Sequence, residues 1–274
     1  MQRRSGSCSA PRSSRTTPAR LGTTTCRSAD RGRLDRLTAS VFTVESPMAQ
    51  EGRSPSTASE TVVAAVVLAA GLGTRFGQPK YSATLRGQRI VDRAIDLVRP
   101  FCRDVVVVLP PGHRWDADPV SAVASGGPTR TESLRAALPL LRPDVDVVVT
   151  HDCVRPLASA DQVEAVIAAV LAGADAAIPA WEPPDTLKRV REDGSVEHLG
   201  REGILVAQSP MAYRRTTLAN VFERLEDVPL EETIGVELIG GRVVPVAGDR
   251  WSQHLVDQRD LAMFERLIGE MDEA

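Results

Sequence analysis

Hydrophobic runs alternate with segments of helical periodicity along most of the chain after residue 60. The runs are rich in valine and alanine, as is typical of strands that are buried on both faces of a parallel sheet. They lie at residues 62–68, 104–109, 144–150 and 175–179. The helical segments lie at residues 90–98, 134–141, 162–171 and 257–268. This alternation predicts an α/β fold with a doubly wound, mostly parallel sheet.

The pattern changes near residue 182. Two short segments, 186–190 and 195–199, flank an Asp-Gly pair, which is a strong signal for a β-hairpin. A last strand is expected at 242–246. The sequence therefore predicts one domain over residues 61–274 that carries a hairpin arm at about 182–206.

Residues 1–60 are rich in Ser, Thr, Arg and Pro and poor in aromatic residues. Such a segment cannot bury enough apolar surface to offset the entropy of ordering, so we expect a disordered tail. It superficially resembles an Arg-rich, acid-poor transit peptide. The alternatives are a solvated tail and a chain that starts at Met48, and we favour the start at Met48 because a domain beginning near Thr61 needs only a short leader.

Charge is unevenly distributed along the chain. The formal net charge is −3, whereas residues 1–47 hold nine Arg and three acidic residues, a net +6 that leaves −9 for the rest. The acidic main body argues against a nucleic-acid partner. The four cysteines show no CxxC or metal-ligand spacing, and no apolar run is long enough to cross a membrane. We therefore expect a reduced, cytoplasmic protein without a membrane partner.

The first hydrophobic run leads directly into a glycine-rich, basic loop with Gly71, Gly73, Arg75 and Lys80. Backbone N–H groups and cations at the carboxyl edge of a parallel sheet favour binding of a phosphate. The loop is not a Walker A motif, since no Ser or Thr follows Lys80, and not a dinucleotide fingerprint, since Phe76 stands where the third glycine belongs. The alternative is an ordinary strand-to-helix turn with surface charges.

A second glycine-rich segment, SGGPTRTES, precedes a predicted helix. Its glycine pair, Gly126 and Gly127, suits a backbone that hydrogen-bonds the edge of a flat base, with Ser133 donating at the helix start. The alternative is a plain capped loop.

The third strand leads into the segment HDCVRP. Asp152 at the carboxyl end of this strand is expected to face the ligand crevice, where it could hold a ribose, an incoming substrate or a divalent metal. Arg155 could clamp a phosphate with two hydrogen bonds. The alternative is a structural Asp–Arg pair, and His151 is expected to be a packed, hydrogen-bonding residue rather than a base.

The string AAGLGTRFG followed by PK, together with GGPTRTES, HDCVRP, DTLK, GREG and AQSPMAY in this order, resembles the sugar-nucleotide pyrophosphorylase-like nucleotidyltransferases. Among them it is most similar to the 2-C-methyl-D-erythritol 4-phosphate cytidylyltransferases. The resemblance runs from about residue 62 to residue 268. It implies that CMP is transferred from CTP to a sugar-alcohol phosphate with release of pyrophosphate, in isoprenoid precursor biosynthesis. It also implies a Mg²⁺ cofactor and a homodimer formed through the hairpin arm.

The resemblance also implies roles for individual residues. The catalytic residues would be Arg75, Lys80, Arg201 and His254. The substrate-binding residues would be Ala69, Ala70, Gly71, Gly73, Gly126, Gly127, Ser133, Asp152, Arg155 and Thr186, with Asp152 also holding the metal.

Several positions depart from the family pattern. Cys153 and Val154 replace two alanines, and the lysine of the family's NIKIT segment falls on His254. Where the family has Thr-Asp-Asp, this chain has Leu230, Glu231 and Glu232. These departures leave three functions open. The chain could use 2-C-methyl-D-erythritol 4-phosphate, it could use ribitol phosphate or another polyol phosphate, or it could be a diverged paralogue that binds nucleotide without turnover.

Overall fold

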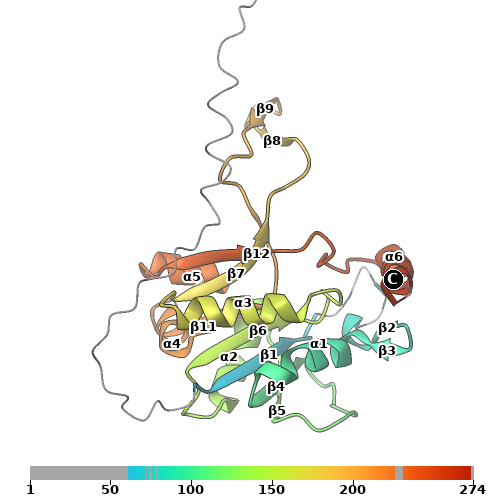
Figure 1. Ribbon diagram of the computed structural model, residues 1–274, viewed down its shortest axis with the longest axis vertical. Coiled ribbons are helices and arrows are strands. Elements are labelled where there is room, and N and C mark those ends of the chain that lie inside the picture. The colour runs from blue at the N-terminus through green and yellow to red at the C-terminus, as the bar shows by residue number, and fades with distance from the viewer. Residues whose placement is uncertain (1–60, 72, 74–75, 78, 226–230, 273–274) are drawn as a thin grey trace, which may run out of the picture. The chain divides into compact units, whose positions relative to one another are not determined.

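The computed structural model describes residues 61–71, 73, 76–77, 79–225 and 231–272, all within one compact unit, 58–274 (Figure 1). The expectations for residues 1–60 and for Arg75 lie outside the described residues. Within the described part of the chain, no helix has the length and apolar character needed to cross a membrane.

In the described part of the chain, eight strands form one sheet in the order β10-β7-β11-β6-β1-β4-β5, with β12 beside β7. Neighbours are parallel from β6 to β5 and between β7 and β12, whereas β10 and β11 run antiparallel to their neighbours. This confirms the mostly parallel α/β sheet. The strands are β1 Val63–Leu68, β4 Asp104–Leu109, β5 Ala122–Ser125, β6 Val147–Asp152, β7 Ala176–Trp181, β10 Val206–Ala207, β11 Met211–Arg214 and β12 Val243–Ala247.

Helices cover both faces of this sheet, and alternate residues of β1 show why. Val63, Ala65 and Val67 pack in one core with α1 (Ile90–Val98), α3 (Ala160–Leu171) and α6 (Gln258–Asp272). Ala64, Val66 and Leu68 pack in a second core with α2 (Arg130–Ala137), α4 (Arg215–Arg224) and α5 (Glu232–Leu238). Because both faces of β1 are buried, the strand has no polar position. In Figure 1, α1 and α3 lie on the viewer's side of the sheet.

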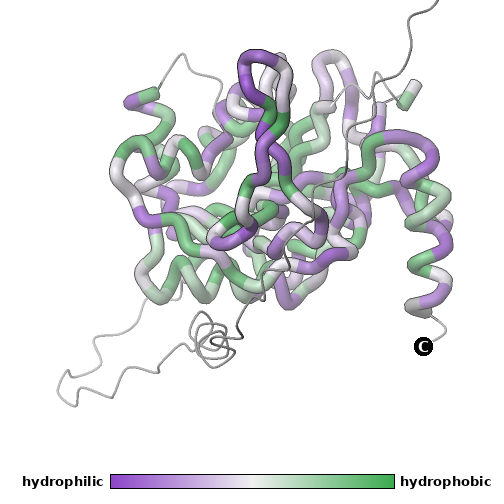
Figure 2. The backbone as a smooth tube through the Cα atoms, turned by 90° about the horizontal axis from the view of Figure 1, so that it is seen from above, coloured by the Kyte–Doolittle hydropathy of each residue, from purple (hydrophilic) through white to green (hydrophobic). Residues whose placement is uncertain are grey.

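Helix α6 is amphipathic, and Figure 2 shows hydrophobic and hydrophilic residues alternating along it toward the C-terminus. Phe264 and Ile268 on its inner side are buried, whereas Met263 is exposed. The helix thereby covers one edge of the first core, and the segment that precedes it is fixed near the carboxyl ends of the strands.

Several predicted elements are confirmed. The structure has α1 and β4 at the expected bounds, and it has the hairpin as β8 (Leu187–Val190) and β9 (Val196–Leu199). Gly194 in the turn has φ +81°, which explains the glycine at this place. The shorter elements are β2 Thr84–Leu85, β3 Gln88–Arg89 and the 3-10 helices η1 Lys80–Ser82, η2 Arg99–Phe101 and η3 Leu138–Leu140.

Two predicted starts are wrong by three residues or more. Helix α2 begins at Arg130 rather than 134, because Thr129 accepts a hydrogen bond from the backbone of Glu132 while the Glu132 side chain accepts from the backbone of Thr129. The helix is therefore capped by Thr129, and Ser133 lies inside its first turn. Strand β6 begins three residues later than predicted, since Asp144 lies in a turn where it pairs with Arg142.

Candidate active site

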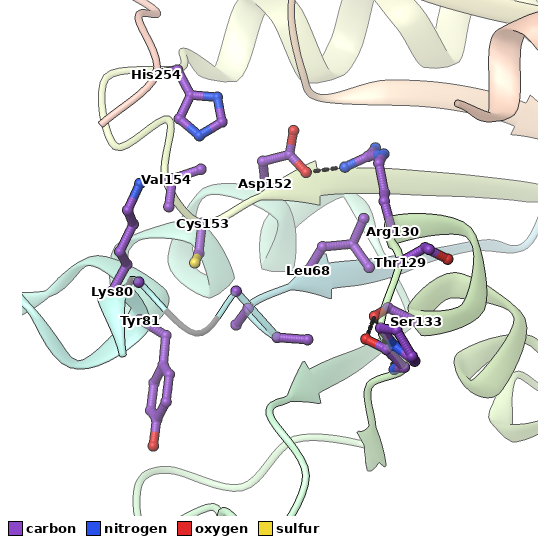
Figure 3. A pocket seen from close by; sticks show the side chains of 16 residues that line it. Leu68, Lys80, Tyr81, Thr129, Arg130, Ser133, Asp152, Cys153, Val154 and His254 are labelled. Atoms are coloured by element: carbon purple, nitrogen blue, oxygen red, sulfur yellow. Dashed lines mark hydrogen bonds and ion pairs between the residues drawn. The ribbon is translucent and has the colours of Figure 1, made fainter. Parts of the chain in front are cut away.

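A pocket of about 380 Å³ opens at the carboxyl ends of β1 and β6 (Figure 3). Four segments enclose it: the glycine-rich loop after β1, the entrance of α2, the end of β6 and the segment before α6. This is the edge where an open α/β sheet binds its ligands.

Most of the predicted site residues meet in this pocket. It is lined by Ala69, Ala70, Gly71, Gly73, Lys80, Gly127, Ser133, Asp152 and His254. Gly126 lies directly behind the lining, and its N–H donates to the carbonyl of Leu109 over 2.8 Å. Arg155, Thr186 and Arg201 are not part of the lining, and Arg75 lies outside the described residues.

The glycine pair is required by packing. A Cβ on Gly126 would lie 2.3 Å from the Cβ of Ala70, and one on Gly127 would lie 2.5 Å from the Cβ of Glu132. Both distances are far below van der Waals contact. A side chain at Gly126 would push the two glycine-rich segments apart, and one at Gly127 would clash with the first turn of α2. The pair therefore sets the width of the pocket wall, while its own N–H groups donate to the Leu109 carbonyl and the Ser133 hydroxyl.

Lys80 is held in a defined position although it is charged. Its side chain is buried, and its Nζ donates to the carbonyl of Leu255 over 2.8 Å. In Figure 3 the side chain runs from η1 toward His254. This hydrogen bond ties the first loop of the domain to the segment before α6, so that a cation and an imidazole share one side of the pocket.

Asp152 also lines the pocket, and it is paired with Arg130. Burial disfavours the charged form of Asp152, but the guanidinium of Arg130 outweighs burial, so the pKa of this carboxyl lies below its usual value. Arg130 also donates from Nε to Glu232 over 2.9 Å. Neither Arg130 nor Glu232 is among the predicted site residues, although Arg130 is the arginine of SGGPTRTES.

The family model for 2-C-methyl-D-erythritol 4-phosphate cytidylyltransferase matches residues 63–270, which is all but the ends of the described domain. The chain belongs to this family. A 2-C-methyl-D-erythritol 4-phosphate cytidylyltransferase from Frankia casuarinae is 35% identical over 225 residues, covering 77% of this chain and 83% of the relative. One from Streptomyces avermitilis is 32% identical over 245 residues, covering 81% of this chain and 97% of the relative.

Solved structures agree on the fold. The crystal structure of the Thermus thermophilus 2-C-methyl-D-erythritol 4-phosphate cytidylyltransferase matches with a TM-score of 0.65 at 24% identity, over 74% of this chain and 97% of that one. The family model and the curated relatives make the chain a cytidylyltransferase of this family, and the solved structure shows that its sheet has the family's nucleotidyltransferase fold.

The two departures from the family's alanines lie in the pocket itself. Cys153 and Val154 both line it, and the N–H of Cys153 donates to the carbonyl of Leu68 over 3.2 Å. The backbone thus continues the pairing of β6 with β1. Burial raises the pKa of the Cys153 thiol above its usual value, so this residue adds apolar bulk rather than charge.

His151 is a packed residue in this cytidylyltransferase, as expected. It is fully buried, and its Nδ1 lies 3.2 Å from the Ser209 hydroxyl, which also accepts a hydrogen bond from the backbone N–H of Asp152. Burial lowers the pKa of His151 to about 4, so the imidazole is neutral at pH 7.

The buried histidine predicts a pH-dependent stability. As the pH falls, the unfolded chain takes up a proton on His151 near the ordinary pKa of 6.5, before the folded chain does near 4. The unfolded state then binds more protons, so this residue should lower the free energy of unfolding between pH 6.5 and 4, by about 3 kcal/mol in total. Urea denaturation of the wild type and His151→Gln at several pH values measures the difference. Equal pH dependence in both proteins would contradict it.

The remaining predicted site residues lie elsewhere in the chain. Arg155 donates to the carbonyls of Ser252, over 2.6 Å, and Ala207, over 3.4 Å. Arg201 donates to the carbonyl of Pro184 over 3.0 Å at the base of the arm, and Thr186 directly precedes β8. Within one copy of the chain these side chains do not complete the pocket.

Proposed function

We propose that this chain transfers the cytidylyl group of CTP to 2-C-methyl-D-erythritol 4-phosphate, giving 4-diphosphocytidyl-2-C-methyl-D-erythritol and pyrophosphate. The observation that carries the proposal is that Lys80, the glycine-rich segments and Asp152 line one pocket at the carboxyl edge of the sheet. The curated relatives named for this activity support the choice of substrates.

The reaction needs no nucleophile from the protein. A phosphate oxygen of the acceptor, already an anion at neutral pH, attacks the α-phosphorus of CTP, and the bond to pyrophosphate breaks. Such a step depends on in-line positioning and on neutralisation of charge. The glycine-rich segments and Ser133 would hold the nucleotide, while Lys80, together with Arg75, would stabilise the charge on the α-phosphate and on the departing pyrophosphate.

We propose Mg²⁺ as the cofactor, with Asp152 as its protein ligand. No cluster of three or more His, Cys, Asp or Glu that could hold a metal occurs among the described residues. The single carboxylate of Asp152 fits Mg²⁺, which is commonly bound through one or two carboxylates and the phosphates of the substrate. When bound, the ion would supply further positive charge to the triphosphate.

We propose further that the chain acts as a homodimer through the arm. Among the described strands, β8 and β9 pair only with each other, and they extend away from the main sheet (Figure 1). Val190 and Val196 on the arm are 69% and 59% exposed, which is costly unless another surface covers them. In such a dimer, Thr186 and Arg201 on the arm of one copy would reach the acceptor side of the pocket in the other copy.

The experiment is an acceptor panel. The protein is incubated with CTP, Mg²⁺ and separate polyol phosphates, including ribitol phosphate, and pyrophosphate release is measured. Release with 2-C-methyl-D-erythritol 4-phosphate well above the other acceptors is expected. Preference for another polyol phosphate would assign that compound as the acceptor instead. No pyrophosphate release with any acceptor would contradict the proposed activity.

The histidine in the pocket favours one alternative function, nucleotide binding without turnover. His254 lines the pocket where the family carries a lysine, and a neutral imidazole offers no fixed charge at pH 7. If the proposed activity is right but limited by this residue, His254→Lys should raise kcat by roughly tenfold, since a fixed cation stabilises the departing phosphates. Steady-state kinetics at pH 7.5 measure the change. CTP binding by calorimetry without product, in both proteins, would favour the alternative.

A further inference from the structure

Three charged side chains from three separate elements form a chain that leads away from the pocket. Asp152 at the end of β6 pairs with Arg130 in the first turn of α2, and Arg130 pairs with Glu232 in the first turn of α5. Asp152 and Arg130 line the pocket, whereas Glu232 does not. Figure 3 shows the Arg130 side chain facing Asp152 across the ion pair.

Glu232 is the innermost member of this chain. Its side chain has no exposed surface, whereas those of Arg130 and Asp152 are 26% and 22% exposed. Removing a carboxylate from water costs free energy, so a buried carboxylate needs a charged partner. The position of Glu232 in the first turn of a helix adds a smaller favourable interaction with the helix dipole.

With both carboxylates ionised, the three side chains together carry one negative charge, because a single guanidinium lies between them. Burial raises the pKa of Glu232 above its usual value, and the Arg130 guanidinium opposes that rise. If Glu232 were neutral, the full charge of Arg130 would act on Asp152 and would compete with any substrate donor or cation for the same oxygens. The hydrogen bonds around Arg130 would allow it to bind Asp152 more fully. Nη2 of Arg130 and Oε1 of Glu232 have no hydrogen-bond partner among the described residues, so the arginine keeps unused capacity to bind Asp152 more completely.

We propose that Glu232 is a positioning residue for cytidylyl transfer. By taking a share of the Arg130 guanidinium, it keeps the Asp152 carboxylate oriented into the pocket and only partly neutralised. This inference rests on the proposed function, since Asp152 must act in the reaction for Glu232 to matter. It gives the acidic start of α5 a role at a distance from the substrate.

The test compares Glu232→Gln with Glu231→Gln. The first change keeps the size of the side chain and removes its charge. The second removes the same charge one residue away, from a side chain that accepts a hydrogen bond from Thr233 over 2.6 Å. We expect kcat to fall roughly tenfold to a hundredfold in Glu232→Gln, with the KM for CTP changed about twofold or less. In Glu231→Gln both constants should stay near the wild-type values.

A charge effect and a packing effect are separated by Glu232→Asp, which keeps the charge and shortens the side chain. This variant should retain more of the wild-type kcat than Glu232→Gln, and it serves alone if the Gln variant does not fold. Equal kcat in Glu232→Gln and the wild type would overturn the inference and leave the proposed function intact. A greater loss of kcat in Glu232→Asp than in a folded Glu232→Gln would also overturn the inference. If Glu232→Gln does not fold, a tenfold loss of kcat in Glu232→Asp would overturn it. A wild-type protein without turnover would overturn the proposed function, and the inference with it.

Discussion

Replacement of Lys80 by glutamine is expected to lower kcat for cytidylyl transfer roughly a hundredfold to a thousandfold. The amine is buried and held by the carbonyl of Leu255, so it is positioned before the substrate binds and needs little reorganisation as charge develops. Glutamine retains a hydrogen-bond donor, and the loss therefore measures the positive charge. If the charge acts mainly in the transition state, the KM for CTP should change much less than kcat.

The matched control is Arg103→Gln. Arg103 is an exposed cation next to the start of β4, at the edge of the sheet opposite the pocket. Its removal changes the net charge equally and should leave kcat within about twofold, because a solvent-exposed charge at that distance is largely screened. A Lys80→Gln protein with kcat near that of the control would mean that the pocket is not where the phosphates react.

Replacement of Asp152 by asparagine is expected to lower kcat roughly a hundredfold. Asparagine keeps the shape of the side chain and its carbonyl oxygen, but it removes the charge that would hold Mg²⁺ or a substrate hydroxyl. It also leaves the Arg130 guanidinium paired with Glu232 alone, which increases positive charge in the pocket. Steady-state kinetics over a range of Mg²⁺ concentrations measure the loss, and the concentration needed for half-maximal rate should rise.

The control for this variant is Asp144→Asn, which removes an exposed carboxylate that is paired with Arg142. Such a surface pair contributes little, so its kinetics should match the wild type. Thermal denaturation of both variants checks that the folds are intact. If Asp152→Asn is folded and its rate and Mg²⁺ requirement equal those of the control, Asp152 is a structural partner of Arg130 and nothing more.

The sequence predicted best the features that are determined by a single local signal. The buried strands β1 and β4 are uninterrupted hydrophobic runs, and α1 has helical periodicity that ends before a proline. The pocket residues Lys80 and Asp152 could be predicted because Lys80 closes the glycine-rich loop after β1 and Asp152 ends β6. Parallel strands bring their carboxyl ends to one edge of the sheet, whichever residues lie between them.

The features that the sequence did not predict depend on contacts between distant segments. The pairing of Arg130 with Glu232 joins residues 102 positions apart, and the acidic segment before α5 looked like a departure from the family rather than a partner for the pocket. The role of Arg155 as a phosphate clamp stays a prediction. The contacts of its guanidinium with the carbonyls of Ala207, at the end of β10, and Ser252, beyond β12, could not be predicted from local sequence. The start of α2 was missed because the capping box of Thr129 and Glu132 lies before the hydrophobic positions of the helix.

The most direct test of the account follows oxygen atoms through the reaction. The acceptor is 2-C-methyl-D-erythritol 4-phosphate with ¹⁸O in the three terminal oxygens of its phosphate, and the products formed with CTP and Mg²⁺ are analysed by mass spectrometry. Attack of the acceptor phosphate on the α-phosphorus predicts a cytidine diphosphate ester that keeps all three labelled oxygens, together with unlabelled pyrophosphate. Label in the pyrophosphate, or CMP formed without the labelled ester, would contradict the proposal that this pocket joins an acceptor phosphate to CTP.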